Sequence, residues 1–211
     1  MNLGLGNLIT LKRFLLATDL VARTTWDEKI TALGQGVARL LERHCNRRFE
    51  RTADALDIFT ADRRSWTLQR FPVESIATIE QRDTVQGGWV SLGAVDSILI
   101  GWDAGSGVVQ FGTVLGPYTS NLRITYTGGL WFDTTEDATG VMPADATPLV
   151  EDIKLAWLLQ CQKAWQVMDP LGTGMTKGGG DVQLVGLSLA GLEVIPQVKQ
   201  LLAPHVRYQI T

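Results

Sequence analysis

Hydrophobic side chains recur with the period of a helix in the last third of the chain. The longest such segment opens at Thr147 and Pro148, which suit an N-cap and a first helical position, and closes at 169–170. Leu155 and Leu159 point away from its main apolar face, so we expect a helix buried in its own core on one side and against another subunit on the other. At about 100° per residue, the main face comprises Val150, Ile153, Trp157, Cys161, Ala164 and Met168.

Two further helical patterns lie near the N-terminus, at about 10–19 and 25–46. Thr25 and Glu28 have the spacing of a capping box at the start of the second helix. Gly34 and Gly36 each cost roughly 1 kcal/mol relative to alanine in a helix interior. Close approach of another backbone, or a less regular helix, would account for them.

From Phe49 the hydrophobic period changes from that of a helix to that of a strand. Glycine-containing turns separate the segments, at 86–88, 103–107 and 128–129. We therefore expect an α+β fold, in which a small antiparallel sheet or sandwich is inserted into a helical core. The expected strands are 55–59, 66–68, 75–81, 89–92, 97–102, 108–111 and 122–126.

These patterns divide the chain into four regions. They are N-terminal helices at 1–48, an antiparallel β insertion at 49–130, an acidic loop with the long helix at 131–170, and a flexible linker with an extended C-terminal tail at 171–211. The tail, with a short helix at 196–202, is too apolar to remain solvated, so it must fold back or dock on a partner. Its apolar residues are Val182, Leu184, Leu187, Leu189, Val194, Ile195, Val198, Leu201 and Leu202.

Composition indicates a soluble globular protein. Of the 211 residues, 45% are hydrophobic and 19% charged, and the formal net charge of −3 gives no general attraction to nucleic acid or anionic membranes. We expect neither a signal peptide nor a membrane span. Cys45 and Cys161 both fall on apolar helix faces, which favours two reduced core residues over a disulfide.

The residues that catalysis requires are sparse. The two histidines, His44 and His205, are far apart in sequence, and no zinc spacing, phosphate loop or nucleophile motif occurs. We therefore expect no enzyme, no metal and no cofactor. The acidic residues between Asp133 and Asp145 lack the spacing of a calcium loop, so a solvated acidic loop is favoured.

A basic stripe follows one side of the second helix. Arg39, Arg43 and Arg47 project there together with Lys29. Such a stripe would attract phosphates in a salt-dependent, sequence-independent way, so these arginines are candidates for facing DNA. A solvated helix face, offset by neighbouring glutamates, is the favoured interpretation.

Four motifs in order carry a resemblance to a known family. They are LERHCNRRF at 41–49, LQRFPVESI at 68–76, ITYTGGL at 124–130 and DIKLAW at 152–157. This order resembles the head–tail connector (adaptor, or head-completion) proteins of long-tailed bacteriophages and related prophages. The resemblance covers about 8–168 and extends loosely to 195–204. The loop at 131–146 departs from the family because it is longer than the usual connection.

The resemblance implies a non-enzymatic structural protein of the virion neck, made in the host bacterial cytoplasm. Twelve copies would form a ring below the portal protein, with the C-terminal tail on the portal. The ring would pass packaged DNA without sequence recognition and offer a platform to the next neck or tail protein, with no membrane partner.

Two other interpretations stay open at this point. One is a different phage assembly protein, such as a tail-completion or baseplate component. The other is a carbohydrate-binding β module, which would use Trp66, Trp89, Trp102 and Trp131 as stacking platforms.

Overall fold

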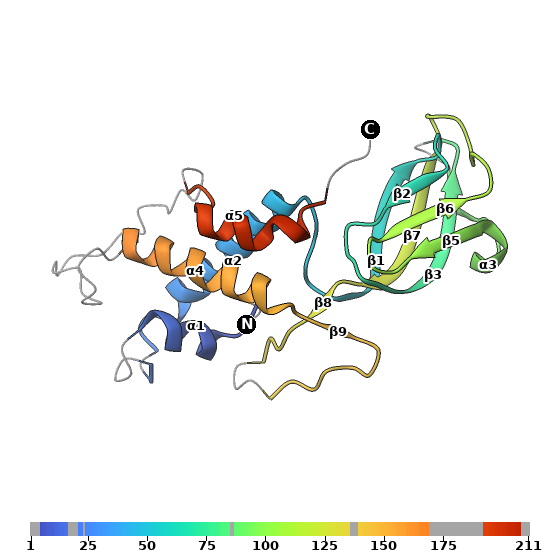
Figure 1. Cartoon of the computed structure of the whole chain (residues 1–211). Helices are drawn as coiled ribbons and strands as arrows, with labels where there is room; N and C mark the ends of the chain where they lie inside the picture. The colour runs from blue at the N-terminus through green and yellow to red at the C-terminus, as the bar shows by residue number, and fades with distance from the viewer. Residues whose placement is uncertain are drawn as a thin grey trace. The chain divides into compact units, whose positions relative to one another are not determined.

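The computed structural model describes residues 5–16, 21–22, 24–84, 87–135, 139–168 and 192–207. The fold is α+β, with helices and antiparallel sheets in separate parts of the chain (Figure 1). Two compact units are present. The helical unit comprises Met1–Asn46, Phe132–Val141 and Leu149–Thr211, and the β unit comprises Arg47–Trp131 and Met142–Pro148. The segment Met142–Pro148 thus belongs to the β unit, although the sequence placed it in one region with the long helix.

The helical unit contains α1 (Leu8–Leu15), α2 (Asp27–Cys45), α4 (Glu151–Met168) and α5 (Pro196–Leu202), and η3 (Ala203–His205) extends α5. Asn7 caps α1 by accepting a hydrogen bond from the Thr10 amide at 2.9 Å. The expected capping box of α2 is wrong, because Trp26 is its N-cap and makes no side-chain hydrogen bond there. At the other end of α2, Asn46 adopts a left-handed conformation (φ 51°) that ends the helix.

The expected start of the long helix is also wrong. Thr147 and Pro148 form β9, which pairs in parallel with β8 (Leu130–Trp131), and α4 begins only at Glu151. The backbone of Thr147 is therefore used in strand pairing rather than in capping a helix. Val150, expected on the core face, precedes α4 and is 40% exposed.

Trp157 lies at the centre of the helical unit and is fully buried. Its indole Nε1 donates to the Gly34 carbonyl oxygen at 3.0 Å, which joins α4 to α2. Its ring also lies against Gly6, where a Cβ atom would come within 2.8 Å of Cζ3. We expected Trp157 where helix meets sheet, but these contacts are made with the N-terminal segment and α2.

The remaining core of the helical unit follows the predicted helix faces. Cys45 and Cys161 are both buried, as expected from their apolar helix faces, and both are free. Other buried residues are Leu11, Ile30, Leu33, Val37, Leu41, Ile153, Ala156 and Ala164.

The β unit contains two antiparallel sheets. The four-stranded sheet has the order β1 (Thr52–Thr60), β7 (Asn121–Gly128), β3 (Val73–Arg82), β4 (Val90–Ser91). The three-stranded sheet has the order β2 (Ser65–Thr67), β6 (Val108–Phe111), β5 (Leu99–Asp103). The strand expected at 97–102 begins later, because Val95–Ile98 forms the helical turn α3, in which the Ser97 hydroxyl donates to the Ala94 carbonyl oxygen at 2.7 Å.

Both sheets contribute to one hydrophobic core. Leu122, Ile124 and Tyr126 all point into it, which confirms the alternation expected for β7. Trp66 from β2 packs edge-to-face on Phe111 from β6, with ring centroids 5.2 Å apart.

A polar network inside this core links β1 and β7 to the segment after β2. The Tyr126 hydroxyl donates to Asp57 Oδ2 at 2.8 Å, and the Gln69 amide donates to the same oxygen at 2.7 Å. The Arg70 amide in turn donates to the Tyr126 hydroxyl at 3.0 Å. Burial, reinforced by the charge of Asp57, raises the pKa of Tyr126 well above its ordinary value.

Trp157→Ala is expected to lower the free energy of unfolding by about 3–5 kcal/mol, because it opens a cavity and leaves the Gly34 carbonyl without its indole partner. Chemical denaturation followed by circular dichroism measures this change. Tyr118→Ala is the control, since Tyr118 is 76% exposed and its loss should change stability by less than about 0.5 kcal/mol. An unchanged midpoint for Trp157→Ala would contradict the placement.

Tyr126 predicts a loss of stability at alkaline pH. Because its folded pKa lies above the unfolded value, its contribution is complete below about pH 10 and falls by roughly 1.4 kcal/mol per pH unit above that. The free energy of unfolding of Tyr126→Phe should therefore decline less steeply than that of the wild type between pH 9 and 11. Tyr118→Phe should follow the wild type, and parallel curves for all three proteins would contradict the prediction.

Candidate assembly surfaces

The C-terminal segment folds back on the helical unit. Helix α5 packs against α4 (Figure 1), and Val194, Val198 and Leu202 are buried there. These three residues were expected to dock on another protein, but in this conformation they belong to the core of their own chain. Ile195 and Leu201 remain half-buried, and the expected docking residues Val182, Leu184, Leu187 and Leu189 lie outside the described residues.

A buried glutamine holds the start of α5 in place. The Gln160 side chain of α4 donates to the Glu193 carbonyl oxygen at 3.0 Å and accepts from the Ile195 amide at 3.1 Å. Beyond α5, the Arg207 amide donates to the Cys45 carbonyl oxygen at 2.9 Å. Hydrogen bonds before and after α5 therefore connect this part of the chain to α4 and to the end of α2. Residues 193–207 are thus packed on the helical unit and are not extended.

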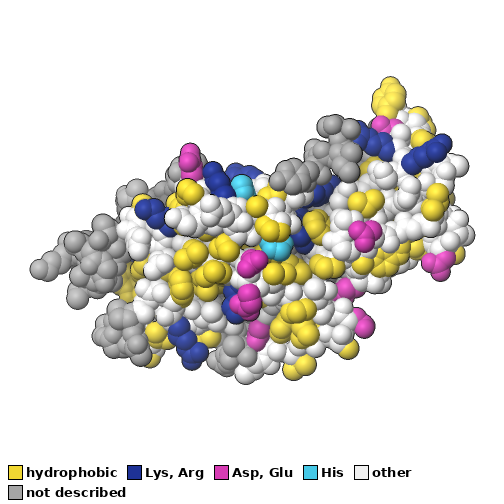
Figure 2. Space-filling view, viewed as in Figure 1, with side chains coloured by type: hydrophobic (Ala, Val, Ile, Leu, Met, Phe, Trp, Pro, Cys, Tyr) yellow, Lys and Arg dark blue, Asp and Glu magenta, His cyan; other side chains and the backbone are white. Residues whose placement is uncertain are grey.

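An exposed apolar strip remains on α4, on the side that faces away from Trp157. Leu155 is 44% exposed and Leu159 is half-buried, and Figure 2 shows hydrophobic side chains gathered over the middle of α4. Leu159 also borders an open groove of about 500 Å³ between α4 and α5. The other residues of the groove are Gln162, Lys163, Gln166, Ile195, Pro196 and Gln197.

The basic stripe is shorter than the sequence indicated. Arg39 and Arg43 are exposed on α2, but Arg47 is only 7% exposed and does not belong to the stripe. Its guanidinium lies 3.4 Å from the ring centroid of Phe71 and donates to the Phe71 carbonyl oxygen. The stripe ends early because the left-handed Asn46 turns the chain out of the helix and into the β unit.

Two partly buried ion pairs lie in the β unit. Arg51 and Glu74 form a bidentate pair, with N–O distances of 2.8 and 2.7 Å, and the hydrogen bond to Glu74 raises the pKa of Arg51. In the Arg123–Glu80 pair, Nε and Nη2 of Arg123 both contact Oε2 of Glu80, at 2.7 and 2.5 Å. These partners are 23 and 43 residues apart, so local sequence patterns gave no signal for them.

Trp66, Trp89 and Trp102 lie in different surroundings and do not form a common stacking platform. Trp66 lies in the core, and the Trp89 ring packs against the guanidinium groups of Arg82 and Arg123, each 4.5 Å from its centroid. Trp102 is 39% exposed on the edge strand β5. A carbohydrate site that depends on these rings together has no support in this arrangement.

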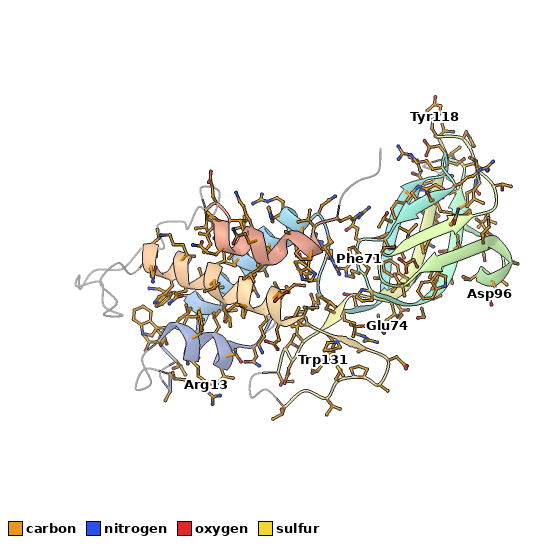
Figure 3. All side chains as sticks on the ribbon, viewed as in Figure 1. Arg13, Phe71, Glu74, Asp96, Tyr118 and Trp131 are labelled. Carbon is orange, nitrogen blue, oxygen red and sulfur yellow. The ribbon has the colours of Figure 1, made fainter. Side chains whose placement is uncertain are left out.

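Further exposed apolar positions lie on β1 and at a loop tip. Leu56 and Ile58 are 47% and 52% exposed, while Asp57 between them points into the core. Tyr118 is 76% exposed, at the end of the β unit opposite Phe71 and Glu74 (Figure 3). On β1 the polar residue is thus buried and the apolar residues are exposed, which is the reverse of the usual alternation. The sequence pattern alone does not reveal this arrangement, because it depends on Asp57 having Tyr126 as a buried partner.

The acidic loop binds its own backbone. Asp133 accepts from the hydroxyl and amide of Thr135, at 2.6 and 2.8 Å, and from the Gly140 amide at 2.8 Å. The Thr135 hydroxyl is the main cause that lowers the pKa of Asp133. Within the described ranges, no three histidine, cysteine or acidic residues are grouped so that they would hold a metal ion. No helix in these ranges has the length and hydropathy needed to cross a bilayer.

The folded-back helix gives a direct stability prediction. Leu202→Ala should lower the free energy of unfolding by about 2–5 kcal/mol, because this side chain at the end of α5 is fully buried against the rest of the helical unit. Leu201→Ala is the matched control, since its half-buried side chain should cost clearly less. Equal effects, or amides of 196–202 that exchange as fast as an unfolded chain in a proven monomer, would contradict the packing of α5.

Comparisons with known proteins bear on the fold. No protein-family model and no curated protein matches the chain. A chain of the neck of an empty gene transfer agent particle, computed with C6 symmetry, matches with a TM-score of 0.53 and 12% identity, over 96% of this chain and 90% of that chain. A chain of the virion of a native gene transfer agent particle matches with a TM-score of 0.54 and 14% identity, over 97% of this chain and 90% of that chain. The protein thus shares, over nearly its whole length, the fold of a chain from the neck of a gene transfer agent particle.

Proposed function

We propose that this protein is a structural component of the neck of a tailed-phage-like virion, where it acts as a head–tail connector (adaptor). The observation that carries the proposal is the shared fold, which spans both units and covers 96% of the chain in the match to a gene transfer agent neck. The four ordered sequence motifs point to the same class of protein. That chain belongs to a neck, which favours a neck position over a baseplate position for this protein.

The proposed mechanism is mechanical. Copies of the chain close into a ring through heterologous contacts, in which one surface of each copy meets a different surface of the next. Twelve copies are compatible with the C6 symmetry used for the neck that shares this fold. The ring extends the channel for packaged DNA, which passes without sequence recognition, and joins the portal protein to the next neck or tail protein.

Portal contact is proposed for the C-terminal part of the helical unit. Ile195 and Leu201 keep part of their side chains exposed, and Ile195 lies at the open groove between α4 and α5. Val194, Val198 and Leu202 support this surface from inside rather than contacting the portal. The apolar positions from Val182 to Leu189 stay a prediction for the same contact.

Electron microscopy of the purified protein mixed with its cognate portal tests the proposal. The expected result is a ring that is coaxial with the portal and contains one copy of the chain per portal subunit. Native mass spectrometry of the same mixture gives the copy number independently. A wild-type protein that neither forms rings nor binds the portal would overturn the proposed function. Glycan-array binding in the absence of rings would instead favour the carbohydrate-binding interpretation.

A further inference from the structure

We propose that Arg39 and Arg43 face the neighbouring copy in the ring rather than DNA, and that they receive the strip formed by Glu151, Asp152, Leu155 and Leu159 on α4 of that copy. This inference rests on the proposed ring and names the two surfaces that close it. All of these residues belong to the helical unit, whose internal arrangement is described above.

The two surfaces lie on opposite sides of the α2–α4 pair. The Gly34–Trp157 hydrogen bond marks the sides on which the two helices face each other. At about 100° per residue, Arg39 and Arg43 are about 140° and 180° from Gly34 around α2. Leu155 and Leu159 are about 160° from Trp157 around α4 by the same measure. Each surface therefore points away from the other helix, as head-to-tail contacts between copies require.

Their chemistry is complementary. Glu151 and Asp152 are exposed and acidic, and Arg39 and Arg43 are exposed and basic. The Glu151 side chain is 83% exposed, and its pair with Lys154 at 3.5 Å contributes little to stability because it lies in water. Glu151 thus keeps the capacity to pair with an arginine of another copy.

The spacing of the two strips also matches when the helices run antiparallel. Glu151, Leu155 and Leu159 follow each other at four-residue steps, and Arg43, Arg39 and Gly36 follow in the opposite direction at four- and three-residue steps. This register places Glu151 beside Arg43 and Leu155 along the aliphatic stem of Arg39. Leu159 then lies opposite Gly36, where the absence of a side chain permits close approach.

The register also accounts for a glycine that the helical core does not explain. Gly34 is buried where the Trp157 indole reaches its carbonyl, whereas Gly36 is half-buried and lies on the side of α2 with the two arginines. A glycine inside a helix costs stability relative to alanine, so contact with a backbone or large side chain of another copy gives Gly36 a role.

Charge reversal tests the contact in the full-length protein. Arg39→Glu/Arg43→Glu and Glu151→Arg/Asp152→Arg should each weaken self-association by about tenfold or more, measured by light scattering and native mass spectrometry. Arg63→Glu/Arg64→Glu is the matched control, because it makes the same charge change at two exposed residues of the β unit. Thermal unfolding of each variant monitors its fold.

Mixing the two reversed proteins gives the sharpest result. In a ring in which the two variants alternate, the reversed α2 surface of one variant meets the reversed α4 surface of the other, and the two unchanged surfaces also meet. Equal amounts of the two variants should therefore restore rings with an even number of copies. Gly36→Leu should prevent rings while the helical unit stays folded. If its fold is lost, the mixing experiment still decides the question.

The outcomes separate this inference from the proposed function. If the wild type forms rings and the Arg39→Glu/Arg43→Glu protein forms them equally well, the inferred contact is wrong and the DNA-facing interpretation of the arginines is favoured. If the wild type forms rings only on the portal, the same variants are compared there. If the wild type forms no ring under either condition, the proposed function itself fails.

Discussion

The burial of one indole ring holds the helical unit together. Trp157 reaches from α4 to the Gly34 carbonyl of α2 and fills the space that Gly6 leaves beside it. Glycine is needed at position 6, because a Cβ there would come within 2.8 Å of the ring. The contact of Trp157 with Gly34 lies where α4 and α2 face each other, so Arg43 on α2 and Leu155 on α4 lie on the opposite, outer sides of the two helices.

The parts of the fold that repeat with a regular period were predictable from the sequence. The inward positions of Leu122, Ile124 and Tyr126 follow from strand alternation, and those of Ile153 and Cys161 from the helical period. Thr147 and Pro148 have the composition of a helix start, but pairing with Leu130 and Trp131 outweighs this local preference. Such tertiary pairing leaves no mark in a short stretch of sequence.

The predicted surface residues were harder to place, for three physical reasons. Arg47 left the basic stripe because a single left-handed residue redirected the chain. Val198 and Leu202 were apolar enough for a docking tail, but they pack within the helical unit of their own chain. The two hydrogen bonds between the Gln160 side chain and the backbone before α5 hold them there. Asp57 lies inside and Ile58 outside because a tyrosine 69 residues away completes the buried polar network.

The path of the chain into and out of the β unit has a consequence for how such proteins diversify. The Leu130 amide donates to the Phe49 carbonyl oxygen at 2.7 Å, and the Arg51 amide donates to the Leu130 carbonyl oxygen at 2.9 Å. Entry and exit are therefore hydrogen-bonded neighbours, and Thr147 on the second passage pairs with Leu130 as well. Because its ends meet and it has its own hydrophobic core, the β unit can be exchanged, shortened or replaced by a tight turn with little geometric demand on the helices. Variation in the sheets and constancy in the helical part is the evolutionary pattern that this connection permits.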